Sequence, residues 1–384
     1  MKLVIITPRV PDILDKGDKL RIYHQIKYLS KFHKIYLICL EKKKDEKINI
    51  EKYIYKLYTF NTTKLERLIN VFYHSFFKKK PIQVSYYYSF KTQKKIDTLI
   101  KIINPDWIYC QLIRSSEYCK FYKHNKILDY MDSFSLGLKR RKSISTGLMK
   151  YLIQFEYNRV KQYEKNIFNF FNHHTIISDF DKNHIEHTDK EKIFVVPNGI
   201  NTNYFKKNNL KINKKILFVG NMSYPPNVLA AKYICEKVFP IINKKEHDFE
   251  IIIAGSNPNS EVKNLKNINS KIKVTGFVDD IRTVYNDACI FIAPMFIGSG
   301  LQNKLLEAMS MKIPCITTEI ANKSLKATKN EIIIAYNEID FANSCIKLLN
   351  NSRKRFELGE NGYNFVKNKF SWQKSTKLIN NLFK

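Results

Sequence analysis

The sequence is short of the features that mark membrane-spanning, disulfide-bonded and metal-binding proteins. It has no run of about 18 apolar residues, so we expect no transmembrane helix. Its seven cysteines are irregularly spaced and form no Cys-x-x-Cys pair, which predicts reduced thiols in a cytoplasmic protein. His173, His174, His184 and His187 lack an accepted ligand spacing, so we expect no metal site.

Acidic residues are also scarce. The chain has 66 Lys and Arg against 35 Asp and Glu, which gives a net charge of +31. Such an excess fits a nucleic acid, an anionic membrane surface, or a composition rich in Lys, Asn and Ile. The sequence has no zinc-finger, basic-zipper or RNA-recognition pattern, so no nucleic-acid partner is expected. Composition and a membrane surface remain the favoured explanations.

Strands alternate with helices along the whole chain of 384 residues. Leu3–Thr7 and Ile35–Leu40 read as strands on either side of a helix at Leu20–Ser30, and a second series begins with a strand at Ile216–Gly220. This pattern predicts an α/β fold with two Rossmann-like, doubly wound domains that face a cleft. We place the domains at residues 1–205 and 206–370, followed by a terminal helix at 371–384.

The most informative segment runs from Gly298 to Met309 and is called the glycine motif here. It follows an apolar run at Cys289–Pro294 that reads as a buried strand, and the pattern becomes helical from Leu301. Free backbone N–H groups at a helix start suit an anionic ligand, and Lys304 adds a cation. Glu307 lies one turn further on, where its carboxylate can accept hydrogen bonds from sugar hydroxyls. The alternative is a solvated helix face with an ion pair.

The glycine motif, with Pro314 after it, resembles the nucleotide-sugar motif of family 4 glycosyltransferases, which have the GT-B fold. Its Gly-x-Gly-x-x-Asn-Lys-x-x-Glu-Ala-Met form resembles a bacterial branch associated with exopolysaccharide synthesis. Val195–Asn201 resembles the Pro-Asn-Gly-Val-Asp segment that closes the first domain in this family. The resemblance implies sugar transfer from a nucleotide-diphosphate donor with retention, no cofactor beyond that donor, and a terminal helix that crosses back onto the first domain.

The chain departs from the family pattern at several donor-binding positions. The family's first motif Glu corresponds to Ser299, the Arg after the strand glycine corresponds to Asn221, and a Lys-Gly pair corresponds to Pro226-Asn227. We therefore expect Lys304 to supply the missing cation. The residues expected to bind the donor are Gly220, Asn221, Gly298, Ser299, Gly300, Leu301, Gln302, Asn303, Lys304 and Glu307.

The resemblance also implies functional residues in the first domain. The segment around Gly17 follows the first strand, and the matching family loop faces the cleft, unless Asp18 only caps the next helix. The strand Ile127–Met131 ends at Asp132, where the family often has a His or Asp near the reacting sugar. Asp132 is preferred over Asp129, with capping as the alternative. We expect catalysis by Glu307 and Asp132, and cleft or acceptor contacts by Gly17, Asp18, Lys19, Arg21 and Asn198.

Asp179-Phe180-Asp181 could hold a metal–diphosphate in another glycosyltransferase fold. Here it follows a short strand-like segment and precedes polar residues, so helix capping is favoured.

The expected acceptor is a glycan or a lipid-linked sugar. Aromatic residues beside basic ones at Phe72–Lys80 suit an anionic membrane surface, which would make the protein peripheral on the inner face of a membrane, but they also suit a core helix with a solvated end. Two other functions stay open: a GT-B scaffold without catalysis, because Ser299 and Asn221 replace family residues, and a charge-driven nucleic-acid binder.

Overall fold

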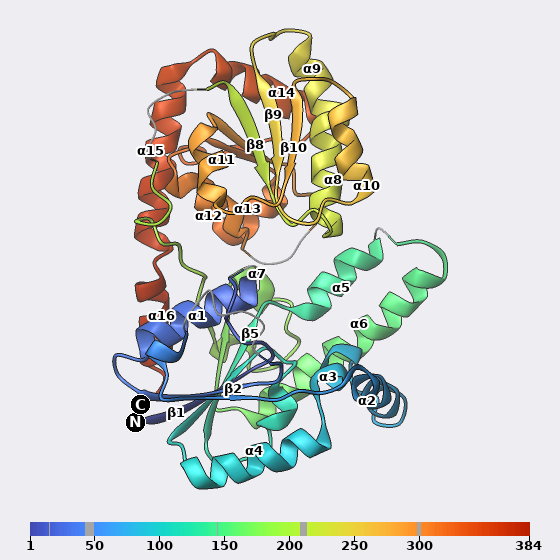
Figure 1. The fold of residues 1–384 in the computed structure, drawn as a ribbon, viewed down its shortest axis with the longest axis vertical. Helices are drawn as coiled ribbons and strands as arrows, with labels where there is room; N and C mark the ends of the chain where they lie inside the picture. Colours follow the sequence, from blue (N-terminus) through green and yellow to red (C-terminus); the bar gives the residue numbers. More distant parts are fainter. Residues whose placement is uncertain (15, 43–49, 144, 208–212, 298–300) are drawn as a thin grey trace. The chain divides into compact units, whose positions relative to one another are not determined.

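The computed structural model describes residues 1–14, 16–42, 50–143, 145–207, 213–297 and 301–384. The chain forms two compact units, which are described separately below (Figure 1). The N-terminal unit comprises Met1–Asn198 together with Trp372–Lys384, and the C-terminal unit comprises Gly199–Ser371. The first of these two segments ends at Asn198, and the sequence analysis placed the boundary near residue 205.

The N-terminal unit is built on a parallel sheet of seven strands in the order β3-β2-β1-β4-β5-β6-β7. A parallel sheet is covered by helices on both faces, and β1, β2 and β4 are accordingly buried over nearly their whole length. The strands are β1 Lys2–Thr7, β2 Lys34–Cys39, β3 Lys56–Thr59, β4 Trp107–Gln111, β5 Asn125–Met131, β6 His173–Ile176 and β7 Ile193–Val195.

Alternate side chains of the central strand β1 enter two different cores. Leu3 and Ile5 pack in the core that also contains residues of α1 and α16. Val4 and Ile6 pack in the core that contains residues of α3, α4 and α6. The helices of this unit are α1 Gly17–Leu29, α2 Lys64–Phe76, α3 Ile82–Tyr87, α4 Phe90–Ile103, α5 Phe134–Ser143, α6 Gly147–Ile167, α7 Asp179–Lys182 and α16 Trp372–Asn380.

The terminal helix α16 packs on α1. The rings of His24 and Trp372 are stacked with centroids 4.6 Å apart, and His33 Nε2 lies 2.7 Å from Asn380 Oδ1. Burial lowers the pKa of His24 to about 4, so this imidazole is neutral in the stacked pair at neutral pH.

The C-terminal unit has a parallel sheet of six strands in the order β10-β9-β8-β11-β12-β13. The strand order reverses between β8 and β11, and loops leave this point in opposite directions, which makes it the usual ligand crevice of such sheets. The strands are β8 Lys215–Val219, β9 Glu250–Ala254, β10 Ile272–Gly276, β11 Ile290–Ala293, β12 Cys315–Thr317 and β13 Ile333–Ile334.

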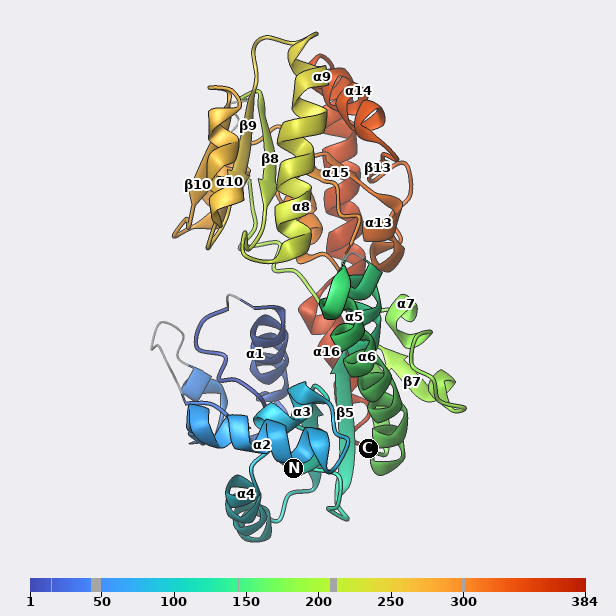
Figure 2. The same cartoon turned by 90° about the vertical axis from the view of Figure 1, so that its right-hand side faces the viewer.

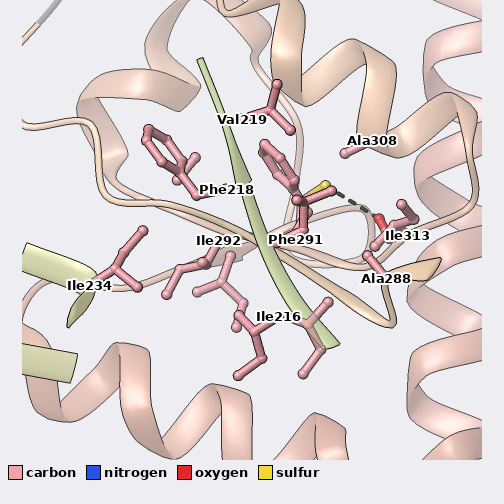
Figure 3. Packing of buried hydrophobic residues seen from close by; sticks show 14 of the residues in the cluster. Ile216, Phe218, Val219, Ile234, Ala288, Phe291, Ile292, Ala308 and Ile313 are labelled. Carbon is pink, nitrogen blue, oxygen red and sulfur yellow. Dashed lines mark hydrogen bonds between the residues drawn. The ribbon is translucent and has the colours of Figure 1, made fainter. Parts of the chain in front are cut away.

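Helices cover both faces of this second sheet. Figure 3 shows Phe291, Ala308 and Ile313 on one side of β8, and Phe218 and Ile234 on the other. Because both faces are apolar and covered, the functional groups are left to the strand ends. The helices are α8 Pro225–Tyr233, continued by a π-helical turn at Ile234–Val238 and α9 Phe239–Asn243, then α10 Ser260–Asn264, α11 Ile281–Asp287, α12 Asn303–Ser310, α13 Glu319–Leu325, α14 Glu338–Leu349 and α15 Ser352–Lys369.

Three helix starts differ from the sequence expectation. Helix α1 begins at Gly17 rather than Leu20, and its N-cap is Lys16, so Asp18 is not the cap. Helix α12 begins at Asn303 rather than Leu301. Helix α7 is capped by Ser178, whose hydroxyl accepts a hydrogen bond from the Asp181 N–H, and both aspartates lie inside its first turn.

Candidate active site

The candidate donor residues lie at the carboxyl end of β8 and at the start of α12, which follows β11. This is the point of the C-terminal sheet where the strand order reverses. Gly220 and Asn221 follow β8 directly, and Leu301 and Gln302 precede α12. Gly298, Ser299 and Gly300, which the sequence also assigned to the donor, lie outside the described residues.

Two glycines allow the ends of β8 and β9 to approach closely. A Cβ added at Gly255, whose φ is +140°, would lie 1.8 Å from the Gly220 carbonyl oxygen. A Cβ added at Gly220 would lie 2.7 Å from Asn227 Nδ2. Gly220 therefore keeps space for the Asn227 side chain beside the strand end.

Asn227 joins the loop after β8 to the start of α12. Its Nδ2 donates to the Asn221 carbonyl oxygen at 2.9 Å, and its Oδ1 accepts from Lys304 Nζ at 2.6 Å. The Asn221 side chain accepts from the Ser223 N–H at 3.0 Å and so shapes its own turn. Asn227 was not among the expected donor residues, although its position was recognised as a departure from the family pattern.

Lys304 is a half-buried cation at the first turn of α12. Its Nζ lies 4.6 Å from the centre of the Phe218 ring. Burial lowers the pKa of Lys304 to about 7, and the charge of Glu307 opposes this shift. The amine is thus poised between its neutral and charged forms near pH 7, and an anion beside it would favour the charged form.

Glu307 is held by Tyr285 of α11. The Tyr285 hydroxyl donates to Glu307 Oε2 at 2.9 Å, and Tyr285 itself is fully buried. Burial raises the pKa of Glu307, whereas the Tyr285 hydrogen bond and Lys304 lower it. Lys304 and Glu307 are both half-buried and each has a separate partner, so the solvated-face alternative is wrong for these two side chains.

In the N-terminal unit, Asp132 follows the end of β5 at a backbone irregularity. Met131 has φ of +64°, and the β5–β6 register shifts between Asp129 and Met131. A non-glycine residue in the left-handed region is uncommon, and here it marks the point where the chain leaves the sheet. Asp132 is half-buried. Helix α5, which begins two residues later, is anchored by Glu164, whose Oε1 accepts from the Phe134 N–H at 2.7 Å.

Arg21 and Asn198, expected to line the acceptor cleft, are interior residues. Arg21 is fully buried; its Nε donates to Asp129 Oδ2 at 2.7 Å and its Nη1 donates to Asn198 Oδ1 at 3.0 Å. Tyr109 and Thr175 also donate to the Asp129 carboxylate. Burial alone would raise the pKa of Asp129, but Arg21 and these hydrogen bonds hold it below its ordinary value. The expectation of acceptor contact is therefore corrected for Arg21 and Asn198, which form a structural network.

Asp18 and Lys19 are buried and engaged in ion pairs. Asp18 accepts from Arg9 Nη1 at 2.7 Å, and Lys19 donates to Asp12 Oδ1 at 2.8 Å. These pairs tie the loop after β1 to the first turn of α1. Gly17, the first residue of α1, is half-buried. The charged side chains of this loop therefore pair with one another, and a role of the loop in the cleft stays a prediction.

Asp181, part of the Asp-x-Asp segment, is buried and accepts hydrogen bonds from the Ser178 hydroxyl and, at 3.3 Å, from the Ser133 N–H. Across the described part of the chain, no group of three or more His, Cys, Asp or Glu side chains is placed to hold a metal ion. No helix in the same part of the chain is long and apolar enough to cross a membrane.

Comparisons with known proteins match both the sequence of the C-terminal unit and the fold of the chain. Residues 213–351 match the family model described as glycosyl transferases group 1. The chain is 26% identical to an uncharacterized 44.6 kDa protein in the cps region of Klebsiella pneumoniae, over 100% of this chain and 99% of that protein. It is 27% identical to the capsular polysaccharide biosynthesis glycosyltransferase CapM of Staphylococcus aureus, over 49% of this chain and 54% of the relative.

Solved glycosyltransferases share the fold over the whole length. Sucrose-phosphate synthase of Thermosynechococcus elongatus superposes with a TM-score of 0.75 at 11% identity, covering 100% of this chain and 98% of the other. HepE of Anabaena in complex with UDP-glucose superposes with a TM-score of 0.71 at 12% identity, covering 100% and 99%. The chain thus has the GT-B fold, and residues 213–351 of its C-terminal unit match the group 1 glycosyltransferase model.

Proposed function

We propose that the enzyme transfers a sugar, with retention at the anomeric carbon, from a nucleotide-diphosphate donor to a glycan or lipid-linked acceptor in cell-surface polysaccharide synthesis. The observation that carries the proposal is Lys304, held by Asn227 at the start of α12 and one turn before Glu307. The cps-region and capsular relatives support the polysaccharide context. The UDP-glucose complex of a structural neighbour supports a uridine-diphosphate sugar as the first donor to test.

The diphosphate leaving group would be stabilised at the start of α12. The helix dipole and the free N–H groups of the first turn favour negative charge, and the Lys304 ammonium adds a charge-assisted hydrogen bond. In the resembled family a cation follows the first strand of this domain, where the present chain has Asn221. Asn227 contacts both Asn221 and Lys304, so Lys304 can supply beside this loop the positive charge that Asn221 lacks.

Glu307 would bind hydroxyl groups of the donor. A carboxylate accepts two or more hydrogen bonds, and Tyr285 occupies only one oxygen, Oε2, with its hydroxyl. The fixed tyrosine orients the carboxylate, which favours one orientation of the donor. In the N-terminal unit, Asp132 would act at the reacting sugar, and the Gly17 N–H at the start of α1 remains the candidate for acceptor or donor contact.

The test is calorimetric titration of a uridine-diphosphate sugar into the native enzyme and into the variant Lys304→Ala. A charged hydrogen bond contributes ~1.5–3 kcal/mol, so the dissociation constant should rise at least several-fold. Lys329→Ala, which removes an exposed cation from the same unit, is the matched control and should leave affinity unchanged. Equal affinity in all three proteins, with the fold intact, would reject the assignment of the diphosphate to Lys304.

We also infer that the exposed face of α2 meets an anionic membrane. Leu65, Leu68, Ile69 and Phe72 are exposed at helical spacing, which argues against a core helix. Lys80 is engaged in an ion pair with Glu117, which leaves Lys78 and Lys79 as the exposed charges of this segment.

Co-sedimentation with vesicles of rising anionic lipid content tests this docking. The double variant Lys78→Gln, Lys79→Gln should bind less than the native enzyme, because each basic residue near anionic lipid contributes about 1 kcal/mol. Lys80 is left unchanged in this variant so that its ion pair with Glu117 stays intact. Equal binding by both proteins would show that these charges do not face a membrane.

A further inference from the structure

The N-terminal half of α6 carries an apolar face that the sequence analysis did not single out. Leu148, Tyr151, Leu152 and Phe155 recur at three- and four-residue intervals, and Leu148 and Tyr151 are each 76% exposed. Met149 is also exposed. The buried side chains of α6, such as Ile153 and Val160, lie on a different stripe. This half of α6 therefore presents large apolar groups outward while its other side packs inward.

Basic residues border this face. Helix α5 packs against α6 and ends in Lys139, Arg140, Arg141 and Lys142, and Lys150 lies in the first turn of α6 (Figure 2). The sequence has no Asp or Glu from Ser133 to Phe155, although acidic residues occur on both sides of this segment. We call Lys139, Arg141 and Lys142 of α5, Lys150 and the apolar face of α6 the α5–α6 tip, and leave out Arg140 because its guanidinium lies over the Phe180 ring.

Hydrogen bonds tie both helices of the tip to the rest of the unit. Glu164 of α6 accepts from the N–H groups of Phe134 and Ser135 and so anchors the start of α5. Glu156, one turn from the apolar face, accepts from the Ile82 N–H at the start of α3 at 2.7 Å. These hydrogen bonds fix the start of α5 and the middle of α6.

We propose that the α5–α6 tip is a membrane-inserting anchor that docks the N-terminal unit on an anionic phospholipid bilayer. Leucine and phenylalanine side chains bury in the acyl boundary, tyrosine suits the interface, and Lys and Arg pair with anionic headgroups. A second copy of the chain is disfavoured as occupant, because a two-fold contact would bring two acid-free basic surfaces together. The proposal is independent of the donor and goes beyond the α2 face.

The apolar part is tested with the triple variant Leu148→Gln, Tyr151→Gln, Phe155→Gln of the full-length enzyme. Its partition coefficient on vesicles containing one-third phosphatidylglycerol should fall at least ~tenfold, since each removed side chain loses a buried apolar area. These side chains are exposed, so the thermal midpoint should change little.

The matched control is Phe90→Gln, Ile102→Gln, Phe121→Gln, which removes three exposed apolar side chains from other elements of the same unit. Vesicle binding by this control should stay at the native level. If both triple variants lose binding to the same degree, the effect is general hydrophobicity and the proposed anchor is rejected.

The charged part is tested by changing Lys139, Arg141, Lys142 and Lys150 to Gln. Binding to anionic vesicles should fall at least ~tenfold, whereas binding to pure phosphatidylcholine vesicles should be unaffected. The control changes four exposed lysines elsewhere in the unit to Gln, for the same loss of charge: Lys91, Lys95, Lys101 and Lys123. An equal loss in both variants would mean that only net charge matters, which would overturn the proposal.

Fluorescence of a tryptophan placed in the tip measures how deeply the tip inserts, which distinguishes insertion from electrostatic attraction to the bilayer surface. The native tryptophans, Trp107 and Trp372, are both buried, so Tyr151→Trp adds an exposed reporter. Its emission should shift to the blue on anionic vesicles and be quenched by brominated acyl chains. Unshifted emission with intact co-sedimentation would contradict insertion. Loss of self-association in the apolar triple variant, without any change in vesicle binding, would identify the tip as an interface between copies instead.

Discussion

Lys304 is a residue whose charge, and hence whose affinity for a diphosphate, should depend on pH in the physiological range. Burial lowers its pKa to about 7 in the free enzyme, and a bound diphosphate would raise it again. Below pH 7 the amine is already charged before the donor binds. Above pH 7 binding must take up a proton, so affinity should fall by up to ~tenfold per pH unit until the pKa of the complex is reached.

Calorimetry between pH 6.5 and 8.5, in buffers of different ionisation enthalpy, measures this proton uptake directly. The variant Lys304→Arg is the control, because a guanidinium stays charged throughout this range. The donor affinity of Lys304→Arg should therefore not fall with rising pH through loss of a proton from residue 304. If the donor affinities of the native enzyme and of Lys304→Arg depend on pH in the same way, the role given to the Lys304 amine is wrong.

We expect Tyr285 to act as a positioning residue for the Glu307 carboxylate, to which its hydroxyl donates. Tyr285→Phe removes the hydroxyl that donates to Glu307 Oε2 and leaves the ring in place. The pKa of Glu307 is already raised by burial, and it should rise further without this hydrogen bond. The acid limb of the kcat/KM profile should therefore move to higher pH, and kcat/KM should fall by ~tenfold. A uniform fall with an unchanged acid limb would indicate a structural role only.

At the scale of elements, the Arg21–Asp129 pair joins α1 to β5 in the N-terminal unit. Arg21→Met leaves a carboxylate buried without its cation, which should cost ~3–5 kcal/mol of unfolding free energy. The double variant Arg21→Met, Asp129→Leu should be less destabilised than the single one. Because the pKa of Asp129 is lowered in the folded protein, the pair stabilises above the ordinary carboxyl pKa, and this contribution is lost as pH falls through the folded value.

Urea unfolding followed by tryptophan fluorescence measures this effect in the N-terminal unit alone, since Trp107 and Trp372 both belong to it. If Arg21→Met is as stable as the native enzyme at pH 7, the Arg21–Asp129 ion pair does not stabilise the unit as proposed.

The regular elements were largely predictable because buried parallel strands are continuous apolar runs. The strands expected at Leu3–Thr7 and Ile216–Gly220 match β1 and β8 to within a residue at each end. The edge strand β3 was missed, since its Lys56-Leu57-Tyr58-Thr59 sequence is only half-buried and carries no apolar run.

The candidate site was predictable only in part. The spacing of the glycine motif located Lys304 and Glu307. It could not show that Asn227, 77 positions away from Lys304, would hold its amine. Nor could local sequence show that Asp129, 108 positions from Arg21, would bury that guanidinium. Both contacts depend on the tertiary structure, which the local sequence pattern does not encode.

At the scale of the whole molecule, we expect catalysis without a metal ion. The proposed charge carriers for the diphosphate are Lys304 and the first turn of α12. Transfer should persist at native rate in excess chelator. Complete loss of activity, restored by magnesium or manganese, would contradict this expectation and reopen a role for Asp179 and Asp181.

The central claim is that the enzyme turns over a nucleotide-diphosphate sugar. The most direct measurement is a mass-spectrometric screen in which the native enzyme and Asp132→Asn are each incubated with a panel of nucleotide sugars and glycan or lipid-linked acceptors. The native enzyme should release nucleoside diphosphate from at least one donor and add one sugar mass to an acceptor, and Asp132→Asn should do so at least ~10²-fold more slowly. Donor binding without release of nucleoside diphosphate from any member of the panel would contradict the account and identify the chain as a binding scaffold.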